Sequence, residues 1–188
     1  MRKRWLFMNL EEKTLKQEYV YKGKIINIRV DDALLPNGKT AKREVVEHNG
    51  GVCVVALTDQ DEVFLVKQFR YPYMEEIFEV PAGKRDGDEN PLDCGIRELR
   101  EETGMIAEKL IPLGQLYPSP GYCGEIIWLY AAVGLTKGEC DPDEDEFLEA
   151  VKIPIATVIE MILRGEIKDA KTQTAVLKVA ELRRQGKL

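Results

Sequence analysis

The sequence contains one histidine, no closely spaced cysteine pair and no long apolar run. A zinc site built from several histidines is therefore impossible, and a catalytic triad would have to use His48, which we expect at a strand end without a chemical role. No stretch approaches the roughly 18 apolar residues of a membrane span, and the start lacks the long apolar region of a signal peptide. Dispersed thiols favour a reducing compartment, so we expect a cytoplasmic protein without a membrane partner. The thiols are those of Cys53, Cys94, Cys123 and Cys140.

Basic residues are also too few for a nucleic-acid binder. The chain has 27 Lys and Arg against 33 Asp and Glu, a net charge of −6, whereas nucleic-acid binding needs a basic surface. The acidic excess is local: residues 86–102 carry a net −5 and residues 141–149 a net −6, which leaves the rest of the chain at +5. We expect these two acidic segments to face each other across bound cations, which would reverse the local sign of the charge.

What the chain does have is enough apolar sequence for a core. Hydrophobic residues make up 44% of 188, which at this length suffices without disulfide bonds. Residues 1–48 are predicted to form a β-rich region with a hairpin at 34–39. Residues 49–188 would form the main domain. Its apolar runs predict strands near 51–57, 63–68, 77–80, 110–117 and 126–133.

Three helices are predicted in the main domain. The first covers residues 91–103, with Asn90 as its N-cap and Gly104 as its stop. The others lie at about 155–164 and 170–184, the last with Asp169 as its N-cap. Strands mixed with helices in this order predict an α/β fold with a mixed sheet.

The side chains that we expect to take part in chemistry lie on the helix at 91–103. Glu98 and Glu102 are four residues apart and share a face, while Arg97 and Glu101 can form an ion pair at the same spacing. Crowded carboxylates repel one another, and hard divalent cations prefer carboxylate oxygens. The alternative is an ordinary solvated amphipathic helix. The apolar side of this helix is expected to consist of Leu92, Ile96, Leu99 and Met105.

A longer pattern decides between these two interpretations. Residues 83–105 match G-x5-E-x7-R-E-U-x-E-E-x-G-U, where U is a bulky aliphatic residue, at every fixed position. The segment resembles the signature of the Nudix hydrolase family. The matched residues are Gly83, Glu89, Arg97, Glu98, Leu99, Glu101, Glu102, Gly104 and Met105.

The resemblance implies a fold, a reaction and a set of roles. The fold would be the Nudix α/β/α sandwich around a mixed β-sheet, with the N-terminal antiparallel β region added. The reaction would be hydrolysis of a diphosphate with Mg²⁺, or alternatively Mn²⁺. Glu98, Glu102 and the carbonyl of Ala82 would bind metal. Glu101 would help to bind metal or orient its waters, and Arg97 would position the glutamates. Gly83, Glu89 and Gly104 would be structural residues of the motif.

A second set of residues resembles the ADP-ribose pyrophosphatase subgroup. It consists of Ser119-Pro-Gly followed by Glu125, residues 43–48, and residues 80–83. The resemblance implies that Glu125 faces the terminal ribose and that Ser119 binds substrate. Arg70 would contact a phosphate and Arg43 would lie near the nucleotide. The alternative for residues 119–121 is an ordinary turn, because these residue types favour turns.

The acidic run at 141–149 has two interpretations. An EF-hand fails, because its sixth position would be Glu146 rather than Gly and its twelfth Lys152 rather than Glu. The run instead resembles the acidic loop of ADP-ribose pyrophosphatases. That resemblance implies Glu144 as the general base and Glu146 as a metal ligand.

The resemblance as a whole implies Mg²⁺-dependent hydrolysis of ADP-ribose to AMP and ribose 5-phosphate by metal-activated water. It also implies a homodimer that exchanges the N-terminal region. The aromatic residue that often stacks on the base is not matched, since residues 24–28 are mainly aliphatic; Tyr21 or Tyr71 could substitute. One alternative is a pyrophosphatase for another nucleoside diphosphate sugar, such as GDP-mannose. Another is a non-catalytic Nudix-fold nucleotide sensor, although such a protein would be expected to lose glutamates that this chain keeps.

Overall fold

The computed structural model describes residues 9–138 and 147–188, which form two compact units. Of the described residues, one unit comprises 9–48 and 119–125, and the other comprises 49–118, 126–138 and 147–188. Glu144 and Glu146 lie outside the described residues, and so does most of the second acidic segment. No helix among the described residues is long and apolar enough to cross a membrane.

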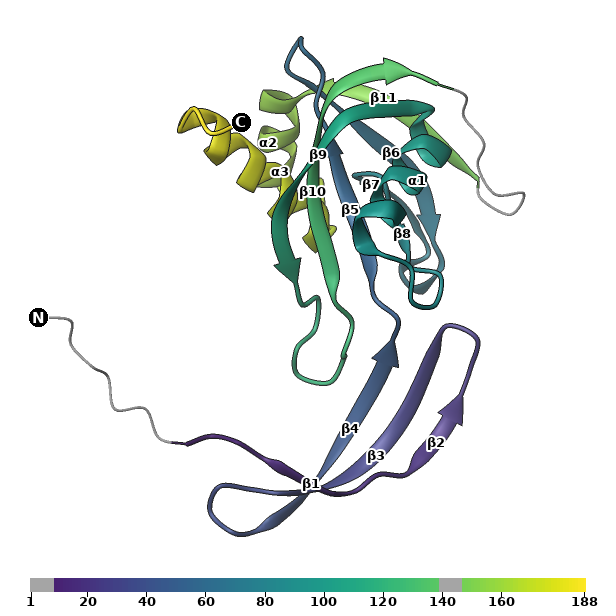
Figure 1. Ribbon diagram of the computed structural model, residues 1–188, viewed down its shortest axis with the longest axis vertical. Coiled ribbons are helices and arrows are strands. Elements are labelled where there is room, and N and C mark those ends of the chain that lie inside the picture. The colour runs from purple at the N-terminus through teal and green to yellow at the C-terminus, as the bar shows by residue number, and fades with distance from the viewer. Residues whose placement is uncertain (1–8, 139–146) are drawn as a thin grey trace, which may run out of the picture. The chain divides into compact units, whose positions relative to one another are not determined.

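Two sheets form the middle of the larger unit (Figure 1). The first is mixed, because β5 runs parallel to β10 while the other pairs are antiparallel. Its strand order is β8 (Ala82–Lys84), β5 (Gly51–Ala56), β10 (Ile127–Lys137) and β9 (Met105–Leu116). The second sheet is antiparallel, in the order β11 (Leu148–Pro154), β6 (Glu62–Arg70) and β7 (Glu75–Glu79).

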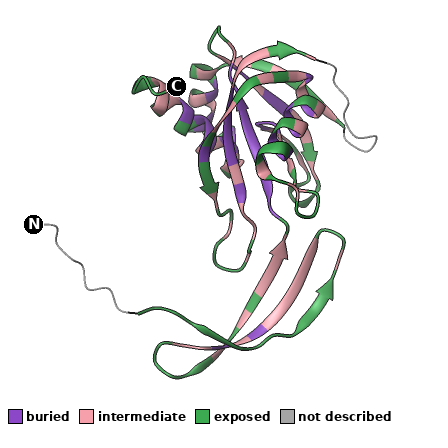
Figure 2. Ribbon diagram, viewed as in Figure 1, coloured by how far each residue is buried: buried purple, intermediate pink, exposed green. Residues whose placement is uncertain are grey.

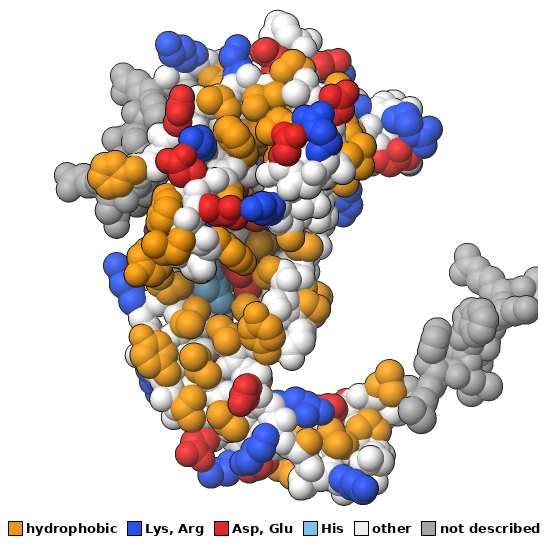
Figure 3. Space-filling view, turned by 180° about the vertical axis from the view of Figure 1, so that it is seen from behind, with side chains coloured by type: hydrophobic (Ala, Val, Ile, Leu, Met, Phe, Trp, Pro, Cys, Tyr) orange, Lys and Arg blue, Asp and Glu red, His pale blue; other side chains and the backbone are white. Residues whose placement is uncertain are grey.

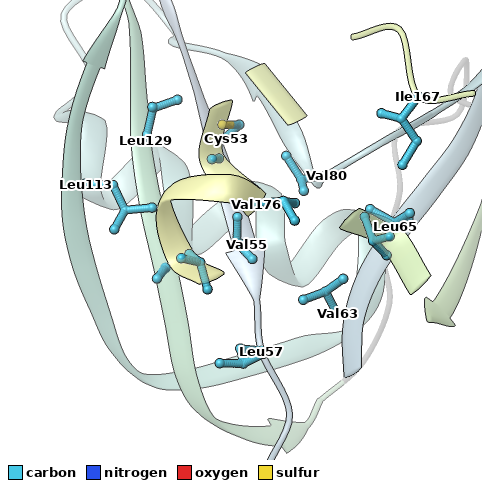
Figure 4. Packing of buried hydrophobic residues seen from close by; sticks show 14 of the residues in the cluster. Cys53, Val55, Leu57, Val63, Leu65, Val80, Leu113, Leu129, Ile167 and Val176 are labelled. Carbon is cyan, nitrogen blue, oxygen red and sulfur yellow. The ribbon is translucent and has the colours of Figure 1, made fainter. Parts of the chain in front are cut away.

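Helices cover both faces of the mixed sheet, and strand β5 lies at the centre with all six residues buried (Figure 2). Val52, Val54 and Ala56 pack in one cluster with residues of helix α1 (Pro91–Thr103). The alternate residues Cys53 and Val55 pack in the other cluster (Figure 4). That cluster includes residues of α2 (Ile155–Leu163) and α3 (Ala170–Arg184). The predicted α/β/α sandwich with a mixed sheet is therefore confirmed.

The helix ends follow from local sequence. The side chain of Asn90 accepts a hydrogen bond from the N–H of Leu92 at 2.9 Å, and Pro91 occupies the first turn, where its missing N–H costs nothing. Gly104 ends α1 with φ of 68°, a left-handed conformation that glycine adopts without steric cost. The side chain of Asp169 caps α3 through the N–H of Thr172.

Several strands differ from the sequence prediction. Strand β8 was not predicted, because three residues of sequence Ala-Gly-Lys show no hydrophobic pattern and become a strand only by pairing with β5. Strand β9 begins at Met105, directly after helix α1, rather than near residue 110. Strand β11 is not among the strands predicted from the sequence. Pro72 lies in the 3-10 helix η1 (Tyr71–Tyr73), outside the strands, where its missing N–H breaks no ladder.

The smaller unit is one antiparallel sheet, in which β3 (Ile26–Leu34) pairs with each of the other strands. These are β1 (Lys13–Lys16), β2 (Tyr19–Lys22) and β4 (Thr40–His48). The predicted hairpin joins β3 to β4, with a hydrogen bond of 2.8 Å from the N–H of Leu35 to the carbonyl of Lys39. Only Asp31 and Ala33 are buried in its four strands, and hydrophobic side chains lie on its surface (Figures 2 and 3).

Candidate metal and active site

The inner face of α1 carries two buried carboxylates. Glu98 is 6% exposed and Glu102 is 2% exposed, and Leu99 is buried beside them. The prediction that Leu92 and Ile96 belong to the packed side is wrong, since they are 40% and 49% exposed. Helix α1 packs against strands β5, β8 and β9, and the face turned to them consists of Cys94, Gly95, Glu98, Leu99 and Glu102.

Glycine at position 83 makes room for Glu98. A Cβ atom on Gly83 would lie 1.9 Å from Cδ and Oε1 of Glu98, a separation that real atoms do not adopt. Gly83 does not have a positive φ, so backbone conformation does not explain its presence. The close approach of β8 to α1 requires glycine here.

The residue before Gly83 holds the second carboxylate. The backbone N–H of Ala82 donates a hydrogen bond of 2.9 Å to Oε2 of Glu102. The carbonyl of the neighbouring Pro81 accepts from the N–H of Val54 on the central strand at 2.8 Å. The chain segment beside the carboxylates is therefore fixed from both sides. The family resemblance implies a role only for the carbonyl of Ala82, and this contact of its N–H has no signal in the sequence.

Arg97 contacts three carboxylates at once. Its Nη1 lies 2.8 Å from Glu98 and 2.9 Å from Glu101, while Nε and Nη2 donate to Glu89 at 3.1 and 3.0 Å. Nη2 also donates to the carbonyl of Lys84 at 3.2 Å. The hydrogen bond from Arg97 lowers the pKa of Glu89 to about 2. One planar guanidinium with five donors can orient several carboxylates in this way.

The loop between β8 and α1 is closed by Glu89 and Arg85. Nε of Arg85 donates to the carbonyl of Glu89 at 2.7 Å, and its guanidinium lies 5.0 Å from the ring centroid of Trp128. The carboxylate of Glu89 also accepts from the N–H of Asp86 at 3.2 Å. These are the contacts that a residue bracing the loop would make.

Arg70 lies at the end of β6 and is held by Glu79 of β7. Nε and Nη2 of Arg70 both donate to Glu79 at 2.6 Å. The hydrogen bond to Glu79 raises the pKa of Arg70, and the charge of Glu102 contributes in the same direction. Arg70 therefore belongs to the same charged neighbourhood as Glu102, while its side chain is 39% exposed.

Three predicted substrate residues lie in the smaller unit. Arg43 forms hydrogen bonds of 2.8 and 2.6 Å with Glu12. The carbonyl of Ser119 accepts from the N–H of Cys123 at 2.9 Å, so this segment does form a turn. Oε1 of Glu125 lies 3.5 Å from Nδ1 of His48, the last residue of β4.

Cysteine chemistry is excluded for the thiols near the site. Burial raises the pKa of Cys53 to about 12, and burial together with Glu89 does the same for Cys94. A thiol with such a pKa is not a nucleophile at neutral pH. Carboxylates and guanidinium groups are what the site offers for chemistry.

The donor set fits a hard divalent cation. Within residues 9–138 and 147–188, no three His, Cys, Asp or Glu side chains are grouped so that they could hold a metal ion. The site nevertheless provides two buried carboxylates one helical turn apart, together with a glycine that lets Glu98 lie close against β8. Carboxylate and carbonyl oxygens are the ligands that magnesium and manganese prefer.

We expect the contribution of Glu89 to stability to depend on pH. Its pKa is lowered from 4.5 to about 2 in the folded chain. A carboxyl group of this kind stabilises the fold above its unfolded pKa and loses that effect as the pH falls toward its folded pKa. In urea unfolding, the difference between wild type and Glu89→Gln should therefore be largest at neutral pH and should shrink between pH 4.5 and 2. The exposed Glu160→Gln is the control, and a difference for Glu89→Gln that does not change with pH would contradict the ion pair with Arg97.

The N-terminal region and the main domain of this chain each match a family of known proteins. Residues 47–174 match the NUDIX domain, and residues 12–46 match the nucleoside diphosphate sugar hydrolase N-terminal domain. A crystal structure described as an ADP compounds hydrolase has a TM-score of 0.83 at 24% identity, over 97% of this chain and 100% of that one. This likeness supports the fold.

Relatives align along most of the sequence. The ADP-ribose pyrophosphatase of Bacillus subtilis (strain 168) is 42% identical over 170 residues, 89% of this chain and 92% of the relative. The methanol dehydrogenase activator of Bacillus methanolicus is 42% identical over 168 residues, 88% and 91% of the two chains. The GDP-mannose pyrophosphatase of Yersinia enterocolitica is 35% identical over 153 residues, 75% and 80% of the two. The chain matches the NUDIX domain over most of its length, carries the complete motif and has the expected fold. The chain therefore belongs to the NUDIX hydrolase family.

Proposed function

We propose that this chain hydrolyses the diphosphate bond of ADP-ribose to give AMP and ribose 5-phosphate. The observation that carries the proposal is the buried pair Glu98 and Glu102 against β8. It occurs in a chain that is 42% identical to an ADP-ribose pyrophosphatase over 170 residues. Nudix hydrolases generally need a divalent metal ion. We propose Mg²⁺ for this chain, with Mn²⁺ as the alternative.

The metal would be held by Glu98, Glu102 and the carbonyl of Ala82. When bound, it neutralises diphosphate oxygens and makes a bound water nucleophilic near neutral pH. Arg97 keeps Glu98 and Glu101 in fixed orientations, which two hydrogen-bonded contacts of 2.8 and 2.9 Å support. Glu101 would bind metal or orient its waters.

Arg70 would bind a phosphate of the substrate. Its bidentate contact with Glu79 uses two of the five guanidinium donors and fixes the plane of the group. A fixed, partly exposed guanidinium is suited to a phosphate, which it can also bind through paired donors. In the smaller unit, Arg43, Ser119 and Glu125 are proposed to contact the nucleotide and the terminal ribose.

The general base is proposed to be Glu144, with Glu146 as a further metal ligand. Both belong to the acidic run at 141–149, outside the described residues. A carboxylate is the proposed base, because the acidic run that contains both residues resembles the acidic loop of ADP-ribose pyrophosphatases. Glu144→Gln and Glu146→Gln, compared for turnover across pH, would distinguish the two roles.

GDP-mannose is the alternative substrate, and the relative from Yersinia enterocolitica at 35% identity supports it. A nucleotide sensor without activity is a weaker alternative, because the motif keeps all its glutamates and their contacts.

We propose the cytoplasm as the location, which the free thiols of Cys53, Cys94 and Cys123 support.

The substrate is tested by direct competition. With Mg²⁺ present, the full chain is incubated with ADP-ribose, ADP-sugars, GDP-mannose, NADH and dinucleoside polyphosphates, and released phosphomonoesters are measured. We expect ADP-ribose to have the highest kcat/KM. Faster turnover of GDP-mannose would contradict the substrate assignment, and tight ADP-ribose binding without turnover of any compound would contradict an enzyme.

Glu102→Gln should reduce the rate by several orders of magnitude while the fold survives, because it removes an anionic ligand.

The role of Gly83 is tested by adding one methyl group. In Gly83→Ala the new Cβ would lie 1.9 Å from the carboxylate of Glu98, so Glu98 must move away. We expect Mn²⁺ binding, measured by electron paramagnetic resonance, to weaken by at least the roughly 10-fold typical of disturbing the surroundings of a metal ligand. Gly121→Ala is the matched control, because nothing lies within 4 Å of its added Cβ. Equal Mn²⁺ affinity in the two variants would contradict a metal at Glu98.

We propose that the chain is a homodimer. The sheet of the smaller unit exposes Leu15, Tyr19, Val20 and Tyr21, each between 45% and 58%. Clustered exposed apolar side chains are typical of interaction surfaces. Light scattering should give the mass of two chains, and Val20→Asp combined with Tyr21→Asp should give one. A wild-type chain that remains monomeric at high concentration would contradict the proposal.

A further inference from the structure

The first turn of helix α3 reaches the segment that leads into the metal site. Thr172 is fully buried and the side chain of Lys171 is 11% exposed. Their partners, Val80 and Glu79, lie 92 residues earlier in the chain. The sequence motif includes neither residue of α3, and the function described above has not used them.

Thr172 makes two directed hydrogen bonds. Its Oγ1 accepts from the backbone N–H of Val80 at 2.9 Å and donates to Oδ2 of Asp169 at 2.6 Å. Asp169 also accepts from the N–H of Thr172, so the same carboxylate caps the helix and fixes the hydroxyl. Valine has the same shape as threonine but would leave the buried N–H of Val80 without this acceptor.

Lys171 completes a group of four charges around the buried carboxylate of Glu79. Its Nζ contacts Glu79 and lies 3.1 Å from Asp169, and Glu79 in turn holds Arg70 through two hydrogen bonds. Burial alone raises the pKa of Glu79, but Arg70 and Lys171 bring it below its usual value. Glu79 is 1% exposed, and the two positive charges balance the two negative ones.

Such a group is a costly way to stabilise a fold. Removing ions from water costs free energy that their mutual attraction often does no more than balance, and apolar side chains of similar size can be equally stabilising. What the charges provide is fixed geometry, since each donor is directed at one acceptor. The role of these four charges therefore depends on which residues they fix in place.

The group holds two elements of the candidate active site. Val80 lies two residues before Ala82, whose N–H binds Glu102. Arg70 lies at the other end of the network, held by Glu79 through two hydrogen bonds, and is proposed above to bind a phosphate of the substrate. We propose that Lys171 and Thr172 are positioning residues: Thr172 fixes the main chain that leads to Ala82, and Lys171 fixes Glu79 and through it Arg70. The proposal rests on the function proposed above.

The Thr172 half is tested by metal binding, which does not require turnover. Mn²⁺ affinity is measured by electron paramagnetic resonance on full-length Thr172→Val, Thr172→Ser and Val179→Ala. We expect Thr172→Val to weaken binding by about 10- to 100-fold, the usual effect of removing a group that orients a metal site. Thr172→Ser keeps the hydroxyl and should bind as wild type does.

Val179→Ala separates positioning from stability. Val179 is fully buried, lies two turns further along α3 and belongs to the apolar cluster. Its truncation should lower the melting temperature without changing Mn²⁺ affinity. Equal affinity in Thr172→Val and wild type would overturn the proposal, as would an equal loss of affinity in Val179→Ala.

The Lys171 half is tested by kinetics with ADP-ribose. Lys171→Met should raise KM severalfold more than it lowers kcat, because it disturbs Arg70 rather than the metal. Lys168→Met is the matched control: Lys168 also pairs with β7, at 2.9 Å from Glu75, but its side chain is 62% exposed. Wild-type KM in Lys171→Met, or the same rise in both variants, would overturn this half.

The two proposals fail in different ways. A wild-type chain that binds Mn²⁺ but hydrolyses no ADP-ribose would overturn the proposed function, and the Mn²⁺ comparison of the Thr172 variants would still decide the first half. A wild-type chain that hydrolyses ADP-ribose, with variants that match it in KM and Mn²⁺ affinity, would overturn only the positioning roles.

Discussion

The burial of two carboxylates side by side is the constraint on which the rest of the site depends. Glu98 and Glu102 are almost excluded from water between α1 and β8, and buried charge is tolerated only where it is paired. Three features of the chain meet that requirement: the guanidinium of Arg97, the N–H of Ala82, and the absence of a side chain at Gly83. The pairing of β8 with β5 and the caps of α1 then set where these groups lie.

This arrangement explains how an acidic chain can accept a diphosphate. The net charge of −6 is concentrated in two segments, and the one the structure describes has its carboxylates oriented by Arg97. A cation bound beside Glu98 and Glu102 would reverse the local sign of the charge. Arg70 adds a fixed positive group to the same neighbourhood. The net acidic charge is the reason that we expect no nucleic-acid partner, and it does not bear on the binding of a single nucleotide.

Local features of the fold could be predicted from sequence, and contacts distant in sequence could not. The bounds of α1 follow from Asn90, Pro91 and Gly104, and the helical spacing of Glu98 and Glu102 correctly predicted that they share a face. The same reasoning correctly placed Leu99 on the packed side but was wrong for Leu92 and Ile96, since the fold buries Glu98 and Glu102 beside Leu99 instead. The bond from Val80 to Thr172 had no sequence signal, since it joins residues 92 positions apart.

We propose that Glu98, Glu102 and the carbonyl of Ala82 hold a divalent cation. Anomalous X-ray scattering from crystals of the full chain grown with Mn²⁺ tests this proposal. We expect an anomalous peak within coordination distance, roughly 2 Å, of both carboxylates and of the Ala82 oxygen. A peak elsewhere, or no peak beside Glu98 and Glu102 at saturating Mn²⁺, would contradict it.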